Sequence, residues 1–515
     1  MERRMDADFL RPFRPWRLFY RNTGLKPCAL CGRAFSPSGK AVELSFRNAA
    51  SIAANLLYPA GEFVLKSTRG GRLNMSKIYI PSLADRRAKG KKLRDRLPRV
   101  DQAIWKPEEG RDILATIRQA NVGRVPKLIP MKMGRMSVSP FAFFRGAAPL
   151  MARDLSGLPT TGLGVQICGD AHVKNLGAYA APDGHLVFDI NDFDETIRGP
   201  WEWDLKRLAA SFVLAGRDAG EKDCTVAVEE LVQCYRESLG LFSRMKALEL
   251  AKYEIHGHAE NEVVRRVMQK GERVTAERTL KKLTEPSASG WPRFHDNLPT
   301  LRHVSEETQR AVFEGLKPYR ETVTAGRQLI LDAYHPVDIA FKVVGTGSVG
   351  TRDYVILLFG YGLDDPMFLQ IKEEMPSCYA PYLKQAERFE NEGRRAAQGQ
   401  QRMQTVTDPF LGWTTIEGRA YLVRQLADHK AAIDPAELKG ETLSEYAVVC
   451  GKVLAKGHAR TGDAAALYGY CGDAAKLDKA MVKFAVAYAD QAAKDYAVFA
   501  KAIKAGKINA IPPDG

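Results

Sequence analysis

The period of the hydrophobic positions changes along the chain, and the change predicts two kinds of structure. Residues 220–330 read as mostly helical, and the segment DLKRLAASFVLAG from Asp204 has apolar residues at helical spacing. From His335 the pattern of apolar residues becomes typical of strands, and three strands are predicted in DIAFKVVGTGSVGTRDYVILLFGYGLDDPMFLQIKEE. A hairpin around Glu417-Gly418 and two long helical patterns follow. Mixed patterns of this kind predict an α+β protein.

The pattern divides the chain into four segments. We expect a basic and partly disordered N-terminal extension over residues 1–105 and a mainly helical lobe over 106–332. A β-rich lobe follows over 333–430, and the C-terminal helices of 431–515 are expected to complete the helical lobe.

The stretch from Val165 to Leu208 carries the clearest chemistry. Two short apolar runs, VQIC and HLVFDI, read as strands, and APDG before the second is a turn signal. Asp170-x-x-x-x-Asn175 follows the first run, and Asp192 follows the second. In a kinase such an Asp deprotonates the acceptor hydroxyl, while the Asn and the second Asp hold Mg²⁺ on the phosphates. Asp189 and Asp194 are secondary candidates near the metal, because neighbouring carboxylates favour a cation between them.

A glycine-rich loop lies between the first two predicted strands after His335. It contains a GxGxxG pattern and reads Gly345, Thr346, Gly347, Ser348, Val349, Gly350. In a dinucleotide-binding fold these glycines would open a helix, but here a strand follows. A glycine loop between antiparallel strands is the kinase type, whose backbone covers ATP phosphates.

The third strand ends in Lys372, where a kinase places the lysine that contacts the α- and β-phosphates. An ordinary edge-strand lysine is the alternative. The helix predicted from APYLKQAERFENEGRRAAQGQQRMQ offers three glutamates as ion-pair partners for this lysine, and spacing does not choose among them: Glu387, Glu390 and Glu392. Gln425 and Leu426 then lie at a hinge whose backbone could pair with adenine.

Six sequence segments also carry a family resemblance. GDAHVKNLG, FDINDFDE and WDLKRLAAS resemble the Brenner motif and metal site of aminoglycoside and choline kinases. With GRMSVSPFAFFRGAAPLM, VGTGSVGTR and LAKGHARTGDA added, the region from about Arg135 to Arg460 resembles a bacterial family catalogued as domain of unknown function 2252. The resemblance implies a two-lobed protein-kinase-like fold in which Asp204 supports the catalytic loop. Asp204 is also a candidate N-cap of its own helix. The chain departs from the kinase patterns at Cys168, where the antibiotic kinases usually have His, and at Asp194, where protein kinases have Gly.

The order of these parts differs from that of a standard kinase. The catalytic loop and metal Asp come before the glycine loop and its lysine, as a circular permutation would produce. The permutation predicts that LAKGHARTGD (454–463) packs beside ICGD (167–170). It also predicts that Lys372 lies within a phosphate's reach of Asp192.

The leading functional hypothesis is a Mg²⁺·ATP-dependent phosphotransferase acting on an unknown hydroxyl acceptor, for which a small molecule is favoured over a protein. Asp170, Asn175 and Lys372 are its catalytic residues, Asn175 and Asp192 its metal ligands, and the glycine loop, Lys372, Gln425 and Leu426 its nucleotide-binding residues. A catalytically silent nucleotide-binding scaffold and an AMP-transferring enzyme are the alternatives. Arg135 and Arg145 suit either phosphate binding or a structural role.

Charge and composition add a third hypothesis and a location. The net charge of +15 lies in residues 1–100, which hold 22 Lys and Arg against 7 Asp and Glu. Such an arm suits binding to nucleic acid or an anionic membrane surface, although a solvated extension is the simpler interpretation. The run RRAKGKKLRDR (86–96) reads as an exposed linker. No long apolar run or signal peptide is visible and eight cysteines are scattered, so we expect a cytoplasmic protein without a transmembrane segment.

Overall fold

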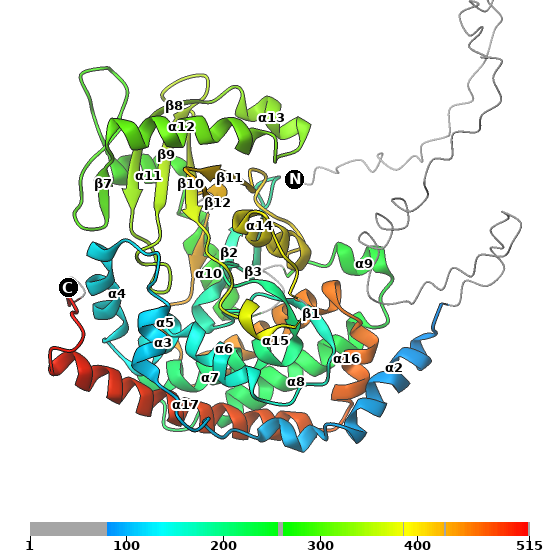
Figure 1. Cartoon of the computed structure of the whole chain (residues 1–515). Coiled ribbons are helices and arrows are strands. Elements are labelled where there is room, and N and C mark those ends of the chain that lie inside the picture. Colours follow the sequence, from blue (N-terminus) through cyan, green and yellow to red (C-terminus); the bar gives the residue numbers. More distant parts are fainter. Residues whose placement is uncertain (1–79, 256–260, 385, 427–428, 513–515) are drawn as a thin grey trace, which may run out of the picture. The chain divides into compact units, whose positions relative to one another are not determined.

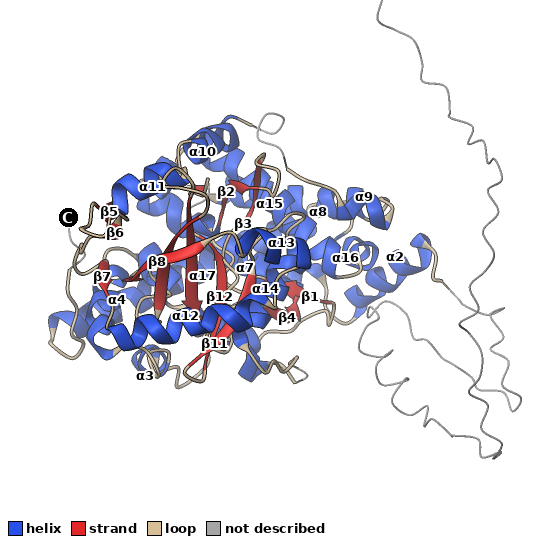
Figure 2. Cartoon of the chain, turned by 90° about the horizontal axis from the view of Figure 1, so that it is seen from above, coloured by secondary structure: helices blue, strands red, loops and turns tan. Residues whose placement is uncertain are grey.

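The computed structural model describes residues 80–255, 261–384, 386–426 and 429–512, and these residues form the expected α+β protein (Figures 1 and 2). Most of the basic extension and its charge therefore lie outside the described residues. In the described part of the chain, no helix combines the length and apolarity that crossing a membrane requires.

A six-stranded antiparallel sheet contains the three strands predicted after His335. Its order is β11-β12-β10-β9-β8-β7, so β8, β9 and β10 form a meander and the β11–β12 hairpin adds to β10. The hairpin turns at Glu417 and Gly418, both with positive φ, as predicted. The strands are β7 (Leu301–His303), β8 (His335–Lys342), β9 (Asp353–Phe359), β10 (Pro366–Glu373), β11 (Gly412–Ile416) and β12 (Arg419–Gln425).

Both faces of this sheet are buried, and the alternation of side chains along each strand explains why. Tyr354, Ile356 and Leu358 of β9 join the core under α12 (Glu306–Arg320). The side chains between them face the opposite way, toward Phe294 and α11 (Ala276–Leu283). The helix α14 (Glu392–Met403) packs on the β11–β12 end. Figure 1 shows α12 lying across the sheet.

The sheet and its helices begin earlier than the predicted lobe boundary at residue 333. β7 pairs with β8, and α12 packs on β11 and supplies Val312 and Tyr319 to the core of the sheet. Leu331 of α13 (Ala325–Leu331) joins the same core. Residues 301–331 therefore belong with the sheet in space, because their apolar side chains find their buried contacts there.

The largest core lies among helices from both ends of the described chain. The helix α15 (Glu441–Thr461) packs extensively against α8 (Thr225–Phe242). In the same way, α17 (Lys476–Lys504) packs against α7 (Trp201–Asp218). Almost every residue of α7 is buried, so this helix is the centre of the group. Further helices are α3 (Ile113–Gln119), α4 (Ile129–Met136), α5 (Pro140–Gly146), α6 (Ala148–Ser156), α9 (Ala247–Ala251), α10 (Glu262–Glu272) and α16 (Ala464–Cys471).

The run expected to be an exposed linker is a packed helix, α2 (Leu83–Lys92). It crosses α16 closely: a Cβ on Gly90 would meet the carbonyl oxygen of Ala466 at 1.9 Å, and one on Gly469 would meet that of Arg87 at 2.2 Å. The charged residues hid this helix in the sequence, because the contact is made through glycine backbone and not through an apolar stripe.

Two small sheets position the loops around Asp170 and Asp192. β1 (Gly164–Ile167) pairs with β4 (Ile197–Pro200), whereas β3 (Leu186–Ile190) pairs with β2 (Leu176–Ala180). The two apolar runs read from the sequence are therefore β1 and β3, but they are not partners, and LGAYA forms a strand between them. The APDG turn closes with a hydrogen bond from Gly184 N to Ala181 O. β13 (Ala431–Ala432) extends the sheet of β2, and β5 (Thr284–Glu285) pairs with β6 (Arg293–Phe294).

Candidate functional site

The backbone of the loop after β1 is fixed by the carboxylate of Asp204. Asp204 accepts hydrogen bonds from the backbone N–H groups of Cys168, at 2.8 Å, and Gly169, at 2.9 Å. The N-cap residue of α7 is Pro200, so Asp204 lies inside the first turn and the N-cap interpretation is wrong. Asp204 therefore fixes the backbone that presents Asp170.

Asp170 is an ionisable group in a largely buried setting. Arg207, on α7, donates from Nε to Asp170 Oδ1 at 2.7 Å, and the ring nitrogen Nε2 of His172 lies 3.6 Å from Oδ2. Burial raises the pKa of Asp170 above its ordinary value, although Arg207 acts in the opposite direction. The carboxylate side chain keeps 19% of its surface exposed, which gives a ligand access to it.

Asn175 and Asp192 come together across the β2–β3 hairpin. Asn175 donates from Nδ2 to the carbonyl of Asp170 at 2.9 Å, so its amide oxygen is the atom left to bind a ligand. Asn191 N donates to Asn175 O at 2.8 Å and brings Asp192 alongside. Asp192 Oδ1 is a buried oxygen without a hydrogen-bond partner. Such an oxygen is suited to a cation.

These two residues fit Mg²⁺ by their chemistry, because Mg²⁺ prefers oxygen ligands and usually takes one or two carboxylates plus phosphate oxygens. Among the described residues, no three His, Cys, Asp or Glu side chains form a ready-made metal-binding group. The residues therefore suit a cation that arrives with a phosphate ligand and completes its coordination there.

Lys372 lies beside Asp192 even though the two residues are 180 positions apart in the sequence. Its ammonium nitrogen Nζ is 3.5 Å from Asp192 Oδ1 and 2.5 Å from Asp194 Oδ1. Leu369 and Ile371 point into the core under α12, so alternation along β10 directs Lys372 to the opposite face. Burial lowers the pKa of Lys372, but Asp192 and Asp194 outweigh it and the net shift is upward. The lysine is therefore charged and held between two carboxylates.

The glycine loop contacts one of these two carboxylates, Asp194. Ser348 donates from Oγ to Asp194 Oδ2 at 3.0 Å, and Arg135 donates to the carbonyl of Gly345. Gly345 and Gly350 have φ of +67° and +95°, which favour glycine. Gly347 has no atom closer than 3.5 Å to the position of a Cβ. Its backbone is therefore accessible to a ligand.

A cavity of about 160 Å³ joins these groups. Its lining includes the loop residues Gly345–Ser348 together with Asp170, Asn175 and Asp192. Pockets for whole cofactors measure roughly 300–1,000 Å³. The cavity is therefore matched in size to phosphate groups and a small cation.

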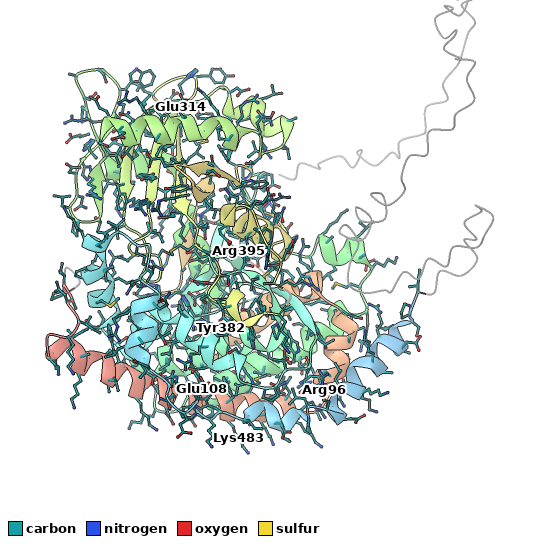
Figure 3. The ribbon with its side chains drawn as sticks, in the orientation of Figure 1. Arg96, Glu108, Glu314, Tyr382, Arg395 and Lys483 are labelled. Carbon is teal, nitrogen blue, oxygen red and sulfur yellow. The ribbon has the colours of Figure 1, made fainter. Side chains whose placement is uncertain are left out.

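The helix α14 contributes an arginine to the site, and none of the three candidate glutamates pairs with Lys372. Glu392 pairs with Arg395, Glu387 pairs with Arg402, and Glu390 is exposed. Arg395 is 2% exposed and lies between the sheet and the helices below it (Figure 3). It donates to the carbonyls of Asp194, at 2.8 Å, and Thr196, at 2.6 Å. The helix thus fixes the backbone after Asp192, while Asp194 pairs with the lysine.

The two hinge candidates already use their backbone donors inside the protein. Gln425 N donates to Asp408 Oδ2 at 2.5 Å, and Leu426 N donates to Phe368 O at 2.9 Å. Gln425 lines a separate cavity of about 40 Å³ that contains Arg424 and Lys430. The structure therefore places both residues outside the cavity at the glycine loop.

The segment 454–463 packs beside the Asp170 loop, as the sequence analysis predicts. Thr461 Oγ1 accepts a hydrogen bond from Gln166 N at 3.1 Å, and His458 Nε2 lies 3.4 Å from Asp204 Oδ2. Lys456 forms a buried ion pair with Asp189. Asp189 is therefore engaged structurally and does not line the cavity.

Two residues of the site carried no readable signal in the sequence. Arg207 sits in an apparently ordinary amphipathic helix, and only the fold turns it toward Asp170. Glu374 follows Lys372 and lines the cavity; burial raises its pKa well above the ordinary value, and its Oε1 is buried without a hydrogen-bond partner. A run of two glutamates after a strand is too common to single out.

Asp353 makes the stability of the sheet pH-dependent. It lies opposite Lys372 on β9, with Oδ2 accepting from Gln370 at 2.7 Å and Oδ1 buried without a partner. Burial raises its pKa to about 7. The folded state therefore binds a proton that the unfolded state releases, so stability falls as pH rises from about 4 to about 7 and is level above that.

We expect Asp353→Asn to remove this loss, which is on the order of 4 kcal/mol at most. Melting temperatures of the variant and the wild type should agree near pH 4 and diverge in favour of the variant up to pH 7. Asp364→Asn, at an exposed turn position, is the control and should follow the wild type. Parallel profiles for Asp353→Asn and the wild type would contradict the assignment.

The chain belongs to the bacterial family described as "Uncharacterized protein conserved in bacteria (DUF2252)", whose model matches residues 124–502. This range includes every residue of the site described above. No curated protein and no solved structure gives a significant match.

Proposed function

We propose that this protein is a Mg²⁺·ATP-dependent phosphotransferase with a two-lobed, circularly permuted kinase-like fold. One observation carries the proposal: Lys372 Nζ lies 3.5 Å from Asp192 Oδ1, although the two residues are 180 positions apart in the sequence. A strand lysine beside the metal-binding Asp is the arrangement that positions ATP phosphates in kinases.

The sheet supports the same proposal. The β8–β9 hairpin carries the glycine loop, β10 carries the lysine, and α14 precedes the β11–β12 hairpin. This is the succession of glycine loop, lysine strand and helix that protein kinases share. The packing of Thr461 against the residue before the Asp170 loop supports the permuted connection.

Each residue then has a defined task. Asp170 orients the acceptor hydroxyl and accepts its proton, and Arg207 and Asp204 hold Asp170 and its loop in place. Lys372 and the backbone of Gly345–Ser348 bind phosphate oxygens. Asn175 and Asp192 are the residues that would hold Mg²⁺, which supplies charge neutralisation on the phosphates. Transfer of a phosphoryl group needs chiefly this positioning and charge compensation.

A catalytically silent nucleotide-binding protein is the second candidate. It is favoured by Asp194, which occupies the lysine that would contact ATP phosphates. The N–H groups of Gln425 and Leu426 are also occupied and leave no donor for adenine at these positions, which favours the scaffold form of this candidate. The two candidates differ in turnover, which a product assay measures.

The reaction is tested by following Mg²⁺·ATP with the full chain by ³¹P NMR, using water and a panel of hydroxyl compounds as acceptors. Phosphoryl transfer releases ADP, whereas transfer of AMP releases pyrophosphate. We expect ADP, and we expect Asp170→Asn to slow its formation roughly hundredfold because the base is lost. The matched control Asp183→Asn, on the exposed turn of the β2–β3 hairpin, should keep the wild-type rate. Pyrophosphate as the product, or no turnover with any acceptor while Mg²⁺·ATP binds, would contradict the proposed reaction.

A further inference from the structure

Three basic side chains line the cavity at the glycine loop, whose lining also contains carboxylates. They are Arg124, in the connection between α3 and α4, Lys132 on α4, and Arg145 on α5. Arg124 donates from Nη1 to the carbonyl of Val349 at 2.8 Å, which ties this group to the glycine loop. The proposed phosphotransferase chemistry assigns no task to these three cations.

Lys132 is buried without a counterion. It is 2% exposed, and its ammonium group donates to the amide oxygen of Asn121 at 3.1 Å. Within the described ranges it forms no ion pair with a carboxylate, and Arg124 and Arg145 form none either. Burying a charge is costly unless it is paired. Burial therefore disfavours the charged form of Lys132, and an anion bound in the cavity would stabilise that form.

Arg145 adds a second buried polar group that an anion could satisfy. Its Nε is a buried donor without a hydrogen-bond partner. Burial lowers the pKa of Arg145 and of Lys132, and the positive charge of Arg124 lowers the pKa of Lys132 further. For Arg145 the carboxylates of Asp170 and Asp192 act in the opposite direction, which places this arginine near the reacting groups. An anion in the cavity would satisfy both the buried charge of Lys132 and the donor of Arg145.

We infer that Arg124, Lys132 and Arg145 form an anion subsite that takes a phosphate or carboxylate group, separate from the position held by Lys372. Guanidinium groups match the two oxygens of such a group, and an ammonium adds a point charge. Two sources share this chemistry. The anion belongs either to the acceptor, which would then be a hydroxyl compound carrying a phosphate or carboxylate, or to the nucleotide's own phosphates. This choice of source rests on the proposed function, whereas the subsite itself does not.

The subsite is tested by titrating inorganic phosphate into the full chain without nucleotide or metal, using calorimetry. We expect Lys132→Met to weaken phosphate binding at least about tenfold, the effect of one charge-assisted hydrogen bond. Lys127→Met, in the same segment but exposed, is the matched control and should bind as the wild type does. Equal phosphate affinities of Lys132→Met and the wild type would overturn the subsite.

The melting temperature of the free protein separates binding from a structural role. Methionine is close to lysine in length and carries no charge, so Lys132→Met should melt at or above the wild-type temperature when no anion is present. A lower melting temperature together with weaker phosphate binding would show that Lys132 serves the fold, and would also overturn the inference.

A second titration, with Mg²⁺ and a non-hydrolysable ATP analogue saturating the protein, identifies the source. Phosphate that still binds, and still depends on Lys132, assigns the subsite to the acceptor. Phosphate that is excluded by the analogue assigns it to the nucleotide. Because the first titration contains no nucleotide, a failure of Mg²⁺·ATP to bind would refute the proposed function and leave the phosphate result standing.

Discussion

Asp192→Asn is expected to abolish the Mg²⁺-dependent part of ATP binding and to reduce turnover roughly a thousandfold, since a bound metal ion supplies several kcal/mol of charge stabilisation. Burial alone would raise the pKa of Asp192, but Lys372, Arg424 and Lys430 hold it below the ordinary range. The carboxylate is therefore ionised at any working pH. Asparagine keeps its size and removes the charge that a cation requires.

The measurement is calorimetric titration of ATP into the variant with and without Mg²⁺. The two affinities should become equal in Asp192→Asn, while Asp183→Asn retains the wild-type difference. Circular dichroism spectra of both variants confirm that the fold is intact. A Mg²⁺ effect of wild-type size in Asp192→Asn would show that the metal binds elsewhere.

Arg111→Met is expected to destabilise the protein by about 3–5 kcal/mol, the cost of breaking a buried ion-pair network from one side. Arg111 bridges Asp154 on α6 and Asp495 on α17, with four hydrogen bonds of 2.7–2.8 Å. The three side chains are at most 5% exposed. Removal of the guanidinium leaves two carboxylates buried beside each other without a cation.

Urea unfolding at neutral pH measures this loss. Arg153→Met is the control, because the Arg153–Glu108 pair nearby is solvent-exposed and such pairs contribute about 1 kcal/mol or less. A further variant that combines Arg111→Met with Asp154→Asn and Asp495→Asn should recover part of the stability, since no charge is then buried. Equal losses in Arg111→Met and Arg153→Met would contradict the network's role.

Much of the sheet could be predicted from the sequence, because strand alternation and turn residues are local signals. The glycine loop, Lys372 and the Glu417-Gly418 turn were placed on the elements that contain them. The lobe boundary at residue 333 differs from the structure for the opposite reason. The helices α12 and α13 have ordinary amphipathic patterns, and a pattern does not reveal which surface will cover its apolar face.

The site divides in the same way. The hypothesis of a permuted order predicts that Lys372 lies near Asp192, and their side chains are 3.5 Å apart in the structure. The predicted partners of Lys372, which are Glu387, Glu390 and Glu392, are wrong. Only Glu392 lies on α14, and this helix supplies Arg395 to the site. Asp194 forms the ion pair with Lys372. In the sequence, Asp194 is visible only as an aspartate where protein kinases have glycine. Long-range charge pairing depends on tertiary contacts that no local spacing encodes.

The most direct test of a metal-dependent nucleotide site is the melting temperature of the wild-type protein with ATP, with and without Mg²⁺. A ligand at about a hundred times its Kd adds roughly 2.7 kcal/mol to the stability of the folded state. The account predicts a clear rise with Mg²⁺·ATP, a much smaller one with ATP alone, and none of the Mg²⁺-dependent part in Lys372→Met. A melting temperature that is unchanged by Mg²⁺·ATP at saturating concentrations would contradict the central claim.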